Sequence, residues 1–144
     1  MEKKIIYLLM SICFITGCNK EPEAINYGKD SCAFCKMTIM DRKFGCELIS
    51  MKGKKIKFDC IECMIDYLQS EDDFIPFKTL VTNYNHPGHF IKAENSFFLH
   101  GGEVKSPMGG NICAFNKRED AAFYQKSLNG DILDWSKAIQ IKFE

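Results

Sequence analysis

Two pairs of cysteines are the residues whose type and spacing most clearly allow chemistry in this sequence. Cys32 pairs with Cys35 and Cys60 with Cys63, each across two residues, and 24 residues separate the two pairs. CxxC pairs at this kind of separation are typical of sites in which four thiolates hold zinc. Because a helix N-terminus lowers thiol pKa values, Cys60 and Cys63 could instead form a redox-active dithiol or a plain structural disulfide.

Methionines close to the first cysteine pair point to a different metal. Met37 follows Cys35 by two residues, and Met108 lies in the loop-like Ser-Pro-Met-Gly-Gly segment at 106–110. Thiolate and thioether sulfurs are soft ligands that select Cu(I) over hard cations. Both methionines adjoin turn-forming residues, so we predict that they are ligands. Three other methionines are expected to fill the core: Met40, Met51 and Met64.

The remaining candidate ligands are three histidines, any of which could give an imidazole to copper: His86, His89 and His100. None has HxH or HExxH spacing, and loop positions on the surface are the simpler interpretation. The sequence has no nucleophile elbow, phosphate-binding glycine loop or carboxylate pair in a suitable context. We therefore predict a binding protein and not an enzyme.

The first eighteen residues predict where the chain works. Lys3 and Lys4 precede a mostly apolar run, and Ile-Thr-Gly-Cys at 15–18 matches a bacterial lipobox. The apolar run is shorter than the roughly 20 residues that a membrane-spanning helix needs. We expect residues 1–17 to be a signal peptide and Cys18 to carry lipid, which anchors the mature chain in a bacterial membrane facing the periplasm.

Composition is consistent with one ordinary domain or two very small ones after the signal. The sequence is 46% hydrophobic, which supports a packed core, and its 19 basic and 19 acidic residues balance. No basic patch stands out, so we exclude nucleic acid as a partner. The polar stretch at 18–30 is expected to be a lipidated tether.

The elements that must position these residues form an α+β fold. Segments 44–51 and 54–58 have the character of a hairpin, and apolar spacing predicts a helix over about 60–70 that Asp59 could cap. A looser second copy of this order has strands within 78–115, a helix over about 116–128 and a short closing helix at 131–139. We predict two small treble-clef-like ββα units from a diverged duplication: a metal-binding unit at 31–74 and a second unit at 75–144.

The stretch at 32–41 (CAFCKMTIMD) resembles the NosL family, the lipoprotein copper chaperones associated with nitrous oxide reductase. The resemblance continues at 57–59, at 63–68, at 106–110 and at 114–115, and it extends over roughly 30–135. It implies a protein that binds Cu(I) outside the cytoplasm and passes it to nitrous oxide reductase while the copper–sulfide centre is assembled.

Carried over by position, the resemblance makes Cys35 and Met37 the best copper ligands, with Met108 as a weaker candidate. Cys60 is not part of the family pattern, which needs only Cys63. Together with Cys32 and Cys35, the pair Cys60 and Cys63 could complete a four-cysteine Zn(II) site. A structural zinc module that serves for interaction is therefore the alternative function. A thiol–disulfide oxidoreductase that uses Cys60 and Cys63 is the third, since strand–CxxC–helix is present without a surrounding thioredoxin pattern.

Overall fold

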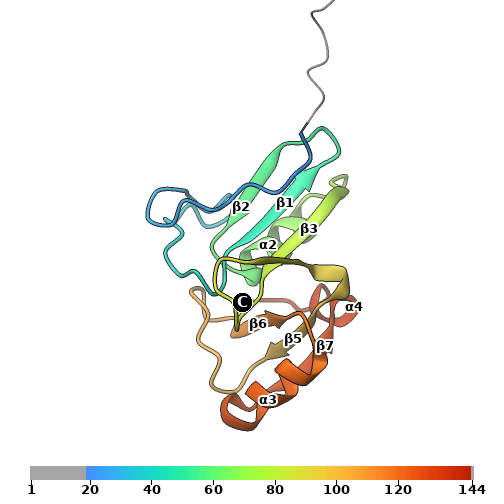
Figure 1. Cartoon of the computed structure of the whole chain (residues 1–144). Coiled ribbons are helices and arrows are strands. Elements are labelled where there is room, and N and C mark those ends of the chain that lie inside the picture. Colours follow the sequence, from blue (N-terminus) through green and yellow to red (C-terminus); the bar gives the residue numbers. More distant parts are fainter. Residues whose placement is uncertain (1–18, 144) are drawn as a thin grey trace, which may run out of the picture.

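The computed structural model describes residues 19–143 as an α+β fold with two small antiparallel sheets (Figure 1). Cys18, the expected lipid attachment site, lies outside the described residues. The elements, in chain order, are β1 (Cys46–Ser50), β2 (Lys55–Phe58), α2 (Ile61–Ser70), β3 (Pro76–Thr82), β4 (Phe90–Lys92), the 3₁₀ helix η1 (Ala93–Asn95), β5 (Phe97–His100), β6 (Ile112–Phe115), α3 (Arg118–Leu128), β7 (Asp131–Asp134) and α4 (Trp135–Ala138).

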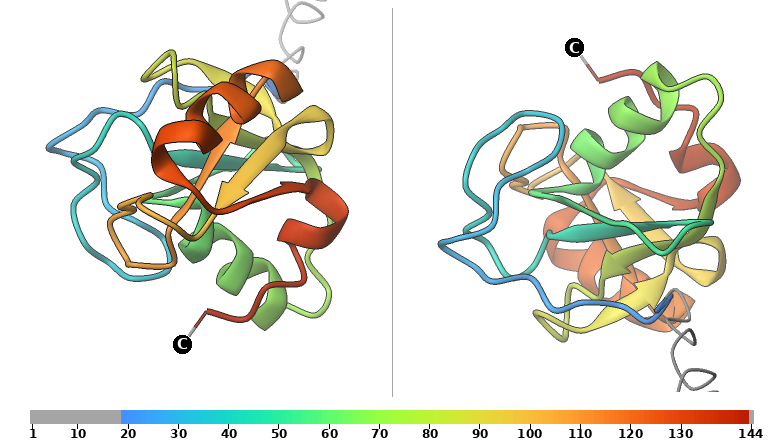
Figure 2. Two further views of the ribbon diagram at one scale, coloured as in Figure 1. Left: turned by 90° about the horizontal axis from the view of Figure 1, so that it is seen from below. Right: turned by 90° about the horizontal axis from the view of Figure 1, so that it is seen from above.

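The strands form a four-stranded sheet in the order β2-β1-β3-β4 and a three-stranded sheet in the order β6-β5-β7. The two sheets meet where β3 ends, because Asn83 forms an isolated parallel bridge with Ala114 and the Tyr84 amide donates to the Ala114 carbonyl over 2.8 Å. Figure 2 shows α2 and α3 on opposite sides of the strands in both views. One hydrophobic core is therefore shared by both sheets.

The first sheet has a different cover on each face. Figure 1 shows α2 behind β1 and β2, and the N-terminal segment in front of them. The Glu23 amide donates to the buried Glu47 carboxylate over 3.0 Å, and Lys57 Nζ contacts Glu23 at 2.7 Å and Asp30 at 2.8 Å. The polar stretch expected to be a tether is thus folded against the sheet over 19–30. The mostly polar composition gave no sign of these contacts with Lys57 and Glu47, or of the burial of Ile25 in the core.

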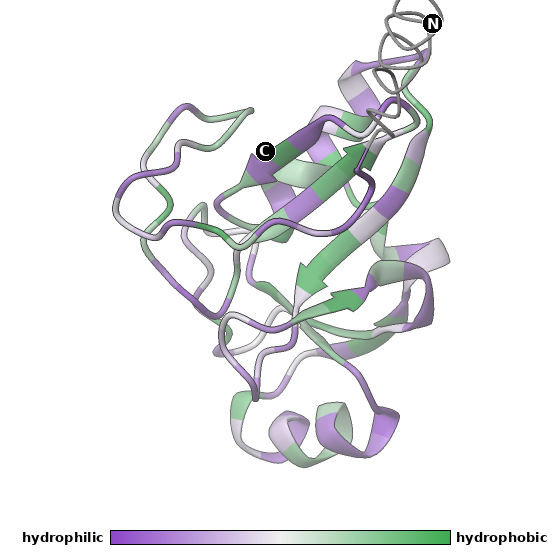
Figure 3. Ribbon diagram, turned by 45° about the horizontal axis from the view of Figure 1, so that its top comes forward, coloured by the Kyte–Doolittle hydropathy of each residue, from purple (hydrophilic) through white to green (hydrophobic). Residues whose placement is uncertain are grey.

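The hydrophobic pattern explains which faces are buried. Figure 3 shows apolar residues concentrated on the strands and polar residues on the loops and on α3. In α2 the first turns are buried and the last turn is half-exposed, so the start of the helix is inserted into the core. The largest fully buried side chains include Phe58, Phe98, Phe115, Ile39, Leu48 and Met64. Contrary to expectation, Met40 and Met51 are 67% and 57% exposed, because they lie in loops that the core does not reach.

Most predicted elements are confirmed, with shifted ends. The hairpin is β1–β2, and the helix expected over 60–70 is α2, although Cys60 occupies its N-cap position and no side chain caps it. The helix expected at 131–139 was wrong in its first half. Residues Asp131–Asp134 form β7, which pairs with β5, and only Trp135–Ala138 are helical.

The boundary predicted between residues 74 and 75 does not separate the two sheets. It falls between α2 and β3, but β3 pairs with β1 along its length, so the first sheet uses strands from both predicted units. Descent of the two units from a duplication stays a prediction. Within residues 19–143, no helix is both long enough and apolar enough to cross a bilayer.

The turn after β5 should be sensitive to a single methyl group. Gly101 and Gly102 both have positive φ, but a Cβ on Gly101 meets nothing within 4 Å, whereas one on Gly102 would lie 2.2 Å from the Leu128 carbonyl oxygen. Gly101→Ala should lower the free energy of unfolding by about 1–2 kcal/mol through backbone strain alone. Gly102→Ala should cost about 1–3 kcal/mol more because backbone atoms cannot move aside cheaply. Urea unfolding of both variants checks this, and equal losses would contradict it.

Candidate metal centre

A tight turn at residues 32–37, which we call the knuckle, presents the first cysteine pair. The Cys32 amide donates to the Met37 carbonyl over 2.8 Å, and the Lys36 amide donates to the Cys32 carbonyl over 3.1 Å. Lys36 has a φ of 65°, a left-handed conformation that closes the turn. The Ala33 amide donates to the Lys57 carbonyl over 2.8 Å, so the knuckle is attached to the end of β2.

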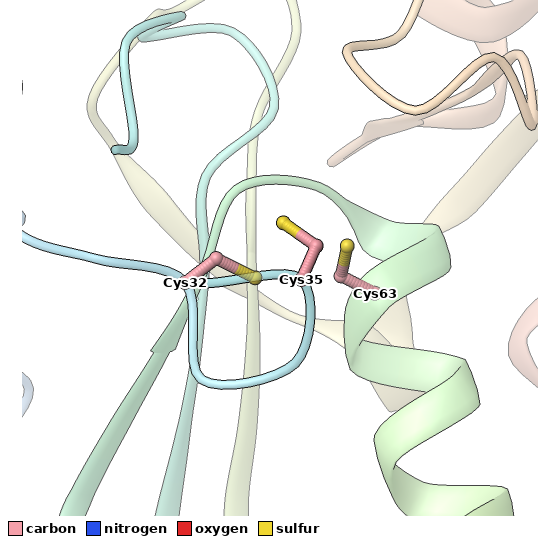
Figure 4. Close-up of side chains that lie close together, drawn as sticks. All are labelled: Cys32, Cys35 and Cys63. Atoms are coloured by element: carbon pink, nitrogen blue, oxygen red, sulfur yellow. The ribbon is translucent and has the colours of Figure 1, made fainter. Parts of the chain in front are cut away.

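The third sulfur comes from the first turn of α2. Figure 4 shows Cys32 and Cys35 on the knuckle and Cys63 on the helix, with the three side chains close together. Their sulfur atoms all lie within 4.8 Å of one another. Cys32 and Cys63 are 1% and 2% exposed, whereas Cys35 is only partly buried. This arrangement can hold one metal ion with access from the Cys35 side.

The three thiols share their protons unequally. The Cys63 thiol donates to the Cys32 sulfur, which lowers the pKa of Cys32 to about 5 against the opposing effect of burial. Backbone amides of Asp59, Cys35 and Phe34 also donate to this sulfur. The same hydrogen bond raises the pKa of Cys63, and burial raises the pKa of Cys35. The cluster therefore carries one thiolate and two thiols, and a cation that displaces the two protons would bind three thiolates.

A cavity of about 930 Å³ opens beside the cluster and brings in the methionine loop. Phe34 of the knuckle, Cys63 of α2 and Met108 of the 106–110 loop all line it, as do His100 and Phe143. Met108 is 46% exposed and lines this cavity, so its side chain is not packed in the core. The structure thus brings segments 32–37, 61–70 and 106–110 around one space.

The loop that carries Met108 is held by Glu62, the residue before Cys63. The Ser106 hydroxyl and the Gly110 amide both donate to one Glu62 carboxylate oxygen, the amide over 3.1 Å. The Asn111 amide then donates to the Ser106 hydroxyl over 2.8 Å. Glu62 is 1% exposed, and burial raises the pKa of its carboxyl group. Its second oxygen has no protein partner.

Gly110 makes this close approach possible. A Cβ at this position would lie 2.1 Å from Glu62 Cγ and 2.6 Å from a ring carbon of Phe143. The glycine is required because two side chains already fill the space that its own would take. We call the Glu62–Ser106–Gly110 contact the latch.

The other predicted ligands lie outside the three-sulfur cluster. Cys60 is fully buried beside Cys63, but its sulfur does not belong to the set within 4.8 Å. Met37 closes the knuckle through its backbone, and its side chain is 56% exposed. His86 and His89 face each other in the exposed turn after β3, with ring centroids 6.4 Å apart. His100 alone of the three histidines lines the cavity.

Sequence reasoning missed Glu62 and Ser106. A glutamate on a helix normally caps it or faces solvent, so the residue type alone gave no reason to single out Glu62. The signal that could have found it was its position between Ile61 and Cys63 on the buried turn of an amphipathic helix, since a carboxylate there must have partners.

Comparison with known proteins identifies the family and supports the fold. The NosL family model matches residues 24–141. The chain belongs to the NosL family. Its fold is similar to the crystal structure of the copper chaperone NosL from Shewanella denitrificans, with a TM-score of 0.72 and 21% sequence identity over 83% of this chain and 96% of that one. No curated protein matches the chain significantly. The predicted α+β class and the resemblance to the NosL family are confirmed.

The protonation of this NosL-family cluster predicts a measurable acid titration. In the metal-free protein, Cys32 should be a thiolate at neutral pH, and it should be protonated as the pH falls through about 5, far below the ordinary value of 9.0. The ultraviolet absorbance of thiolate should therefore decrease in that range, and Cys32→Ser should abolish the decrease. An absorbance that stays constant as the pH falls through about 5 would contradict the proton sharing described above.

The latch predicts that Glu62 orders the methionine loop. Glu62→Ala should lower the free energy of unfolding by about 1–3 kcal/mol, because it leaves buried donors unsatisfied. It should also speed hydrogen exchange at the amides of Gly110 and Asn111. Glu62→Gln is the matched control, since its carbonyl oxygen can accept the same two hydrogen bonds. Equal exchange in the alanine variant and the unsubstituted protein would show that the latch does not order the loop.

Proposed function

We propose that this protein is a metallochaperone that binds Cu(I) outside the cytoplasm and delivers it to nitrous oxide reductase during assembly of the copper–sulfide centre. The observation that carries the proposal is the convergence of three cysteine sulfurs within 4.8 Å at the edge of a cavity that Met108 also lines. Membership of the NosL family supports the same function. In this proposal copper is cargo, and the protein performs no catalytic turnover.

The donor set supports Cu(I) as that cargo. The three ligands of the cluster and the nearby Met108 are all sulfur donors, and soft sulfur ligands favour Cu(I). The single thiolate on Cys32 would provide the first attraction for the cation. Cys35 and Cys63 would lose their protons on binding, so affinity should fall as the pH is lowered.

Exposure of the ligands supports release as well as binding. Cys32 and Cys63 are buried and would retain the ion, whereas Cys35 is partly exposed and Met108 is 46% exposed. Met37, 56% exposed, could join from the other end of the knuckle. A ligand from the acceptor protein could therefore replace the outer sulfurs one at a time, which is the chemistry that transfer requires.

We also propose that lipid on Cys18 anchors the chain in a bacterial membrane facing the periplasm. The lipobox at 15–18 supports this location. It keeps the cluster on the side of the membrane where a periplasmic reductase would receive copper.

The two alternative functions receive less support. A structural zinc site is closed by four ligands, and Cys60 does not lie with the other three sulfurs. Zn(II) therefore remains only a second metal that the three thiolates could hold. A thiol–disulfide oxidoreductase needs an accessible nucleophile, and Cys60 and Cys63 are 0% and 2% exposed.

Anaerobic titration of the 19–144 protein with Cu(I) tests the proposal, after a metal count on the purified sample. We expect one tight equivalent of Cu(I). Cys35→Ser and Cys63→Ser should each weaken binding by more than about a hundredfold, and Met108→Leu by about tenfold, since even indirect partners of a metal contribute that much. Cys113→Ala is the matched control, because Cys113 is buried in β6 outside the cluster.

Two outcomes would contradict the proposal. One is undiminished Cu(I) binding in both serine variants. The other is tightly bound zinc that Cu(I) does not displace. The delivery step is tested by mixing the Cu(I)-loaded protein with copper-free nitrous oxide reductase. Copper that stays with the loaded protein would contradict delivery to this reductase but not the binding of Cu(I).

A further inference from the structure

Three large apolar side chains are exposed together at one end of the first sheet. Met51 is 57% exposed in the β1–β2 turn, and Ile75 is 77% exposed just before β3. Phe77, the second residue of β3, is 44% exposed. Ser50 pairs with Pro76, so the turn with Met51 lies beside the residue that follows Ile75. Ile75 and Phe77 are two residues apart on extended backbone and project to the same side. We call these three side chains the apolar tip.

The described chain begins at this same end. Lys20 Nζ lies 4.5 Å from the centre of the Phe77 ring, and Lys55 donates to the Asn19 carbonyl. Figure 1 shows the N-terminal segment entering beside the β1–β2 turn. Two residues of extended chain reach at most about 7 Å. A lipid on Cys18 would therefore be joined to the chain within this distance of the Lys20 Cα atom, with no long spacer before the segment whose Lys20 side chain contacts Phe77.

We propose that the apolar tip contacts the lipid bilayer, with Met51, Ile75 and Phe77 entering the interface beside the lipid on Cys18. This inference rests on the lipid anchor of the proposed function. One acyl chain alone gives marginal binding, and further apolar contact beside the anchor strengthens it. Scattered exposed apolar residues need no explanation, but a cluster next to the lipid attachment site does.

Charge around the tip adds little net attraction to a charged surface. Lysines surround it: Lys20, Lys52, Lys54, Lys55 and Lys78. Acidic residues also lie at this end: Glu21, Glu71, Asp72 and Asp73. Since the two groups nearly offset each other, the tip needs no strongly anionic surface. Lysine stems beside apolar side chains suit the interfacial layer, where ammonium groups reach the headgroups.

The proposal fixes which way the metal centre faces. Cys63 is the third residue of α2, which ends at Ser70, and Ile75 lies five residues beyond that end. The seven residue steps from Cys63 to Ser70 rise about 10 Å along the helix. The sulfur cluster would be held off the membrane by this distance, with its cavity open to the periplasm for a partner.

Tryptophan placed at the tip tests the contact directly. The lipidated full chain is reconstituted in vesicles of phosphatidylethanolamine and phosphatidylglycerol, with and without brominated acyl chains, in a Trp135→Phe background. Ile75→Trp should lose fluorescence in the brominated vesicles. Phe123→Trp is the matched control, because Phe123 is 68% exposed on α3, which Figure 1 places at the opposite end of the molecule, and it should keep its fluorescence.

If Ile75→Trp is as insensitive to bromine as the control, the proposal is overturned, and the tip is free for a protein partner or a second copy. Should Trp135→Phe fail to fold, Trp135 is retained and its signal is subtracted. Recovery of the chain in the membrane fraction, and its loss in Cys18→Ser, separates failure of the tip from failure of the anchor. Cu(I) titration of Ile75→Trp, expected to be unchanged, separates it from failure of the metal centre.

Discussion

The metal centre depends on one hydrogen bond between two backbones, from the Ala33 amide to the Lys57 carbonyl, 2.8 Å long. It attaches the knuckle to the end of β2, and α2 begins three residues after the last residue of β2. This junction places the two sulfurs of the knuckle beside the start of the helix that carries the third. The Lys57 side chain strengthens it, since its ammonium group contacts Glu23 and Asp30 on either side of the incoming chain. One residue of β2, Lys57, therefore contacts both the N-terminal segment and the knuckle that carries two of the sulfurs.

Two layers of contacts with different purposes surround the cluster. Buried Cys32 and Cys63 share a proton, which leaves a thiolate ready for a soft cation. Outside them, Glu62 fixes the methionine loop by hydrogen bonds that do not involve sulfur. Met108 can thus line the cavity without being packed in the core. A site with two buried sulfurs and more exposed outer sulfurs suits a carrier, which must bind its metal and then release it.

The sequence predicted local features well, and long-range contacts only in part. The CxxC pair and the methionine two residues later identified the knuckle, and apolar spacing located α2, because both signals lie within a few residues. Cys60 illustrates the limit: its spacing from Cys63 matches a zinc pair and its thiol is a neighbour of Cys63, but it is not one of the three sulfurs that all lie within 4.8 Å of one another. The partner of Glu62 lies 44 residues away and leaves no periodic signal. The N-terminal segment looked like a tether because it is mostly polar, and its contacts with Lys57 and Glu47 on the hairpin and the burial of Ile25 are all long-range.

The account also links the location of the protein to its chemistry. The N-terminal end and the apolar tip would face the bilayer, while the cluster lies at the other end of α2, open to a partner. X-ray absorption spectroscopy of the Cu(I)-loaded 19–144 protein tests the central claim most directly, because it reports the ligand atoms themselves. The account predicts a copper shell with at least three sulfur neighbours, reduced in Cys35→Ser. A shell with fewer than three sulfurs, or one that is unchanged in that variant, would contradict it.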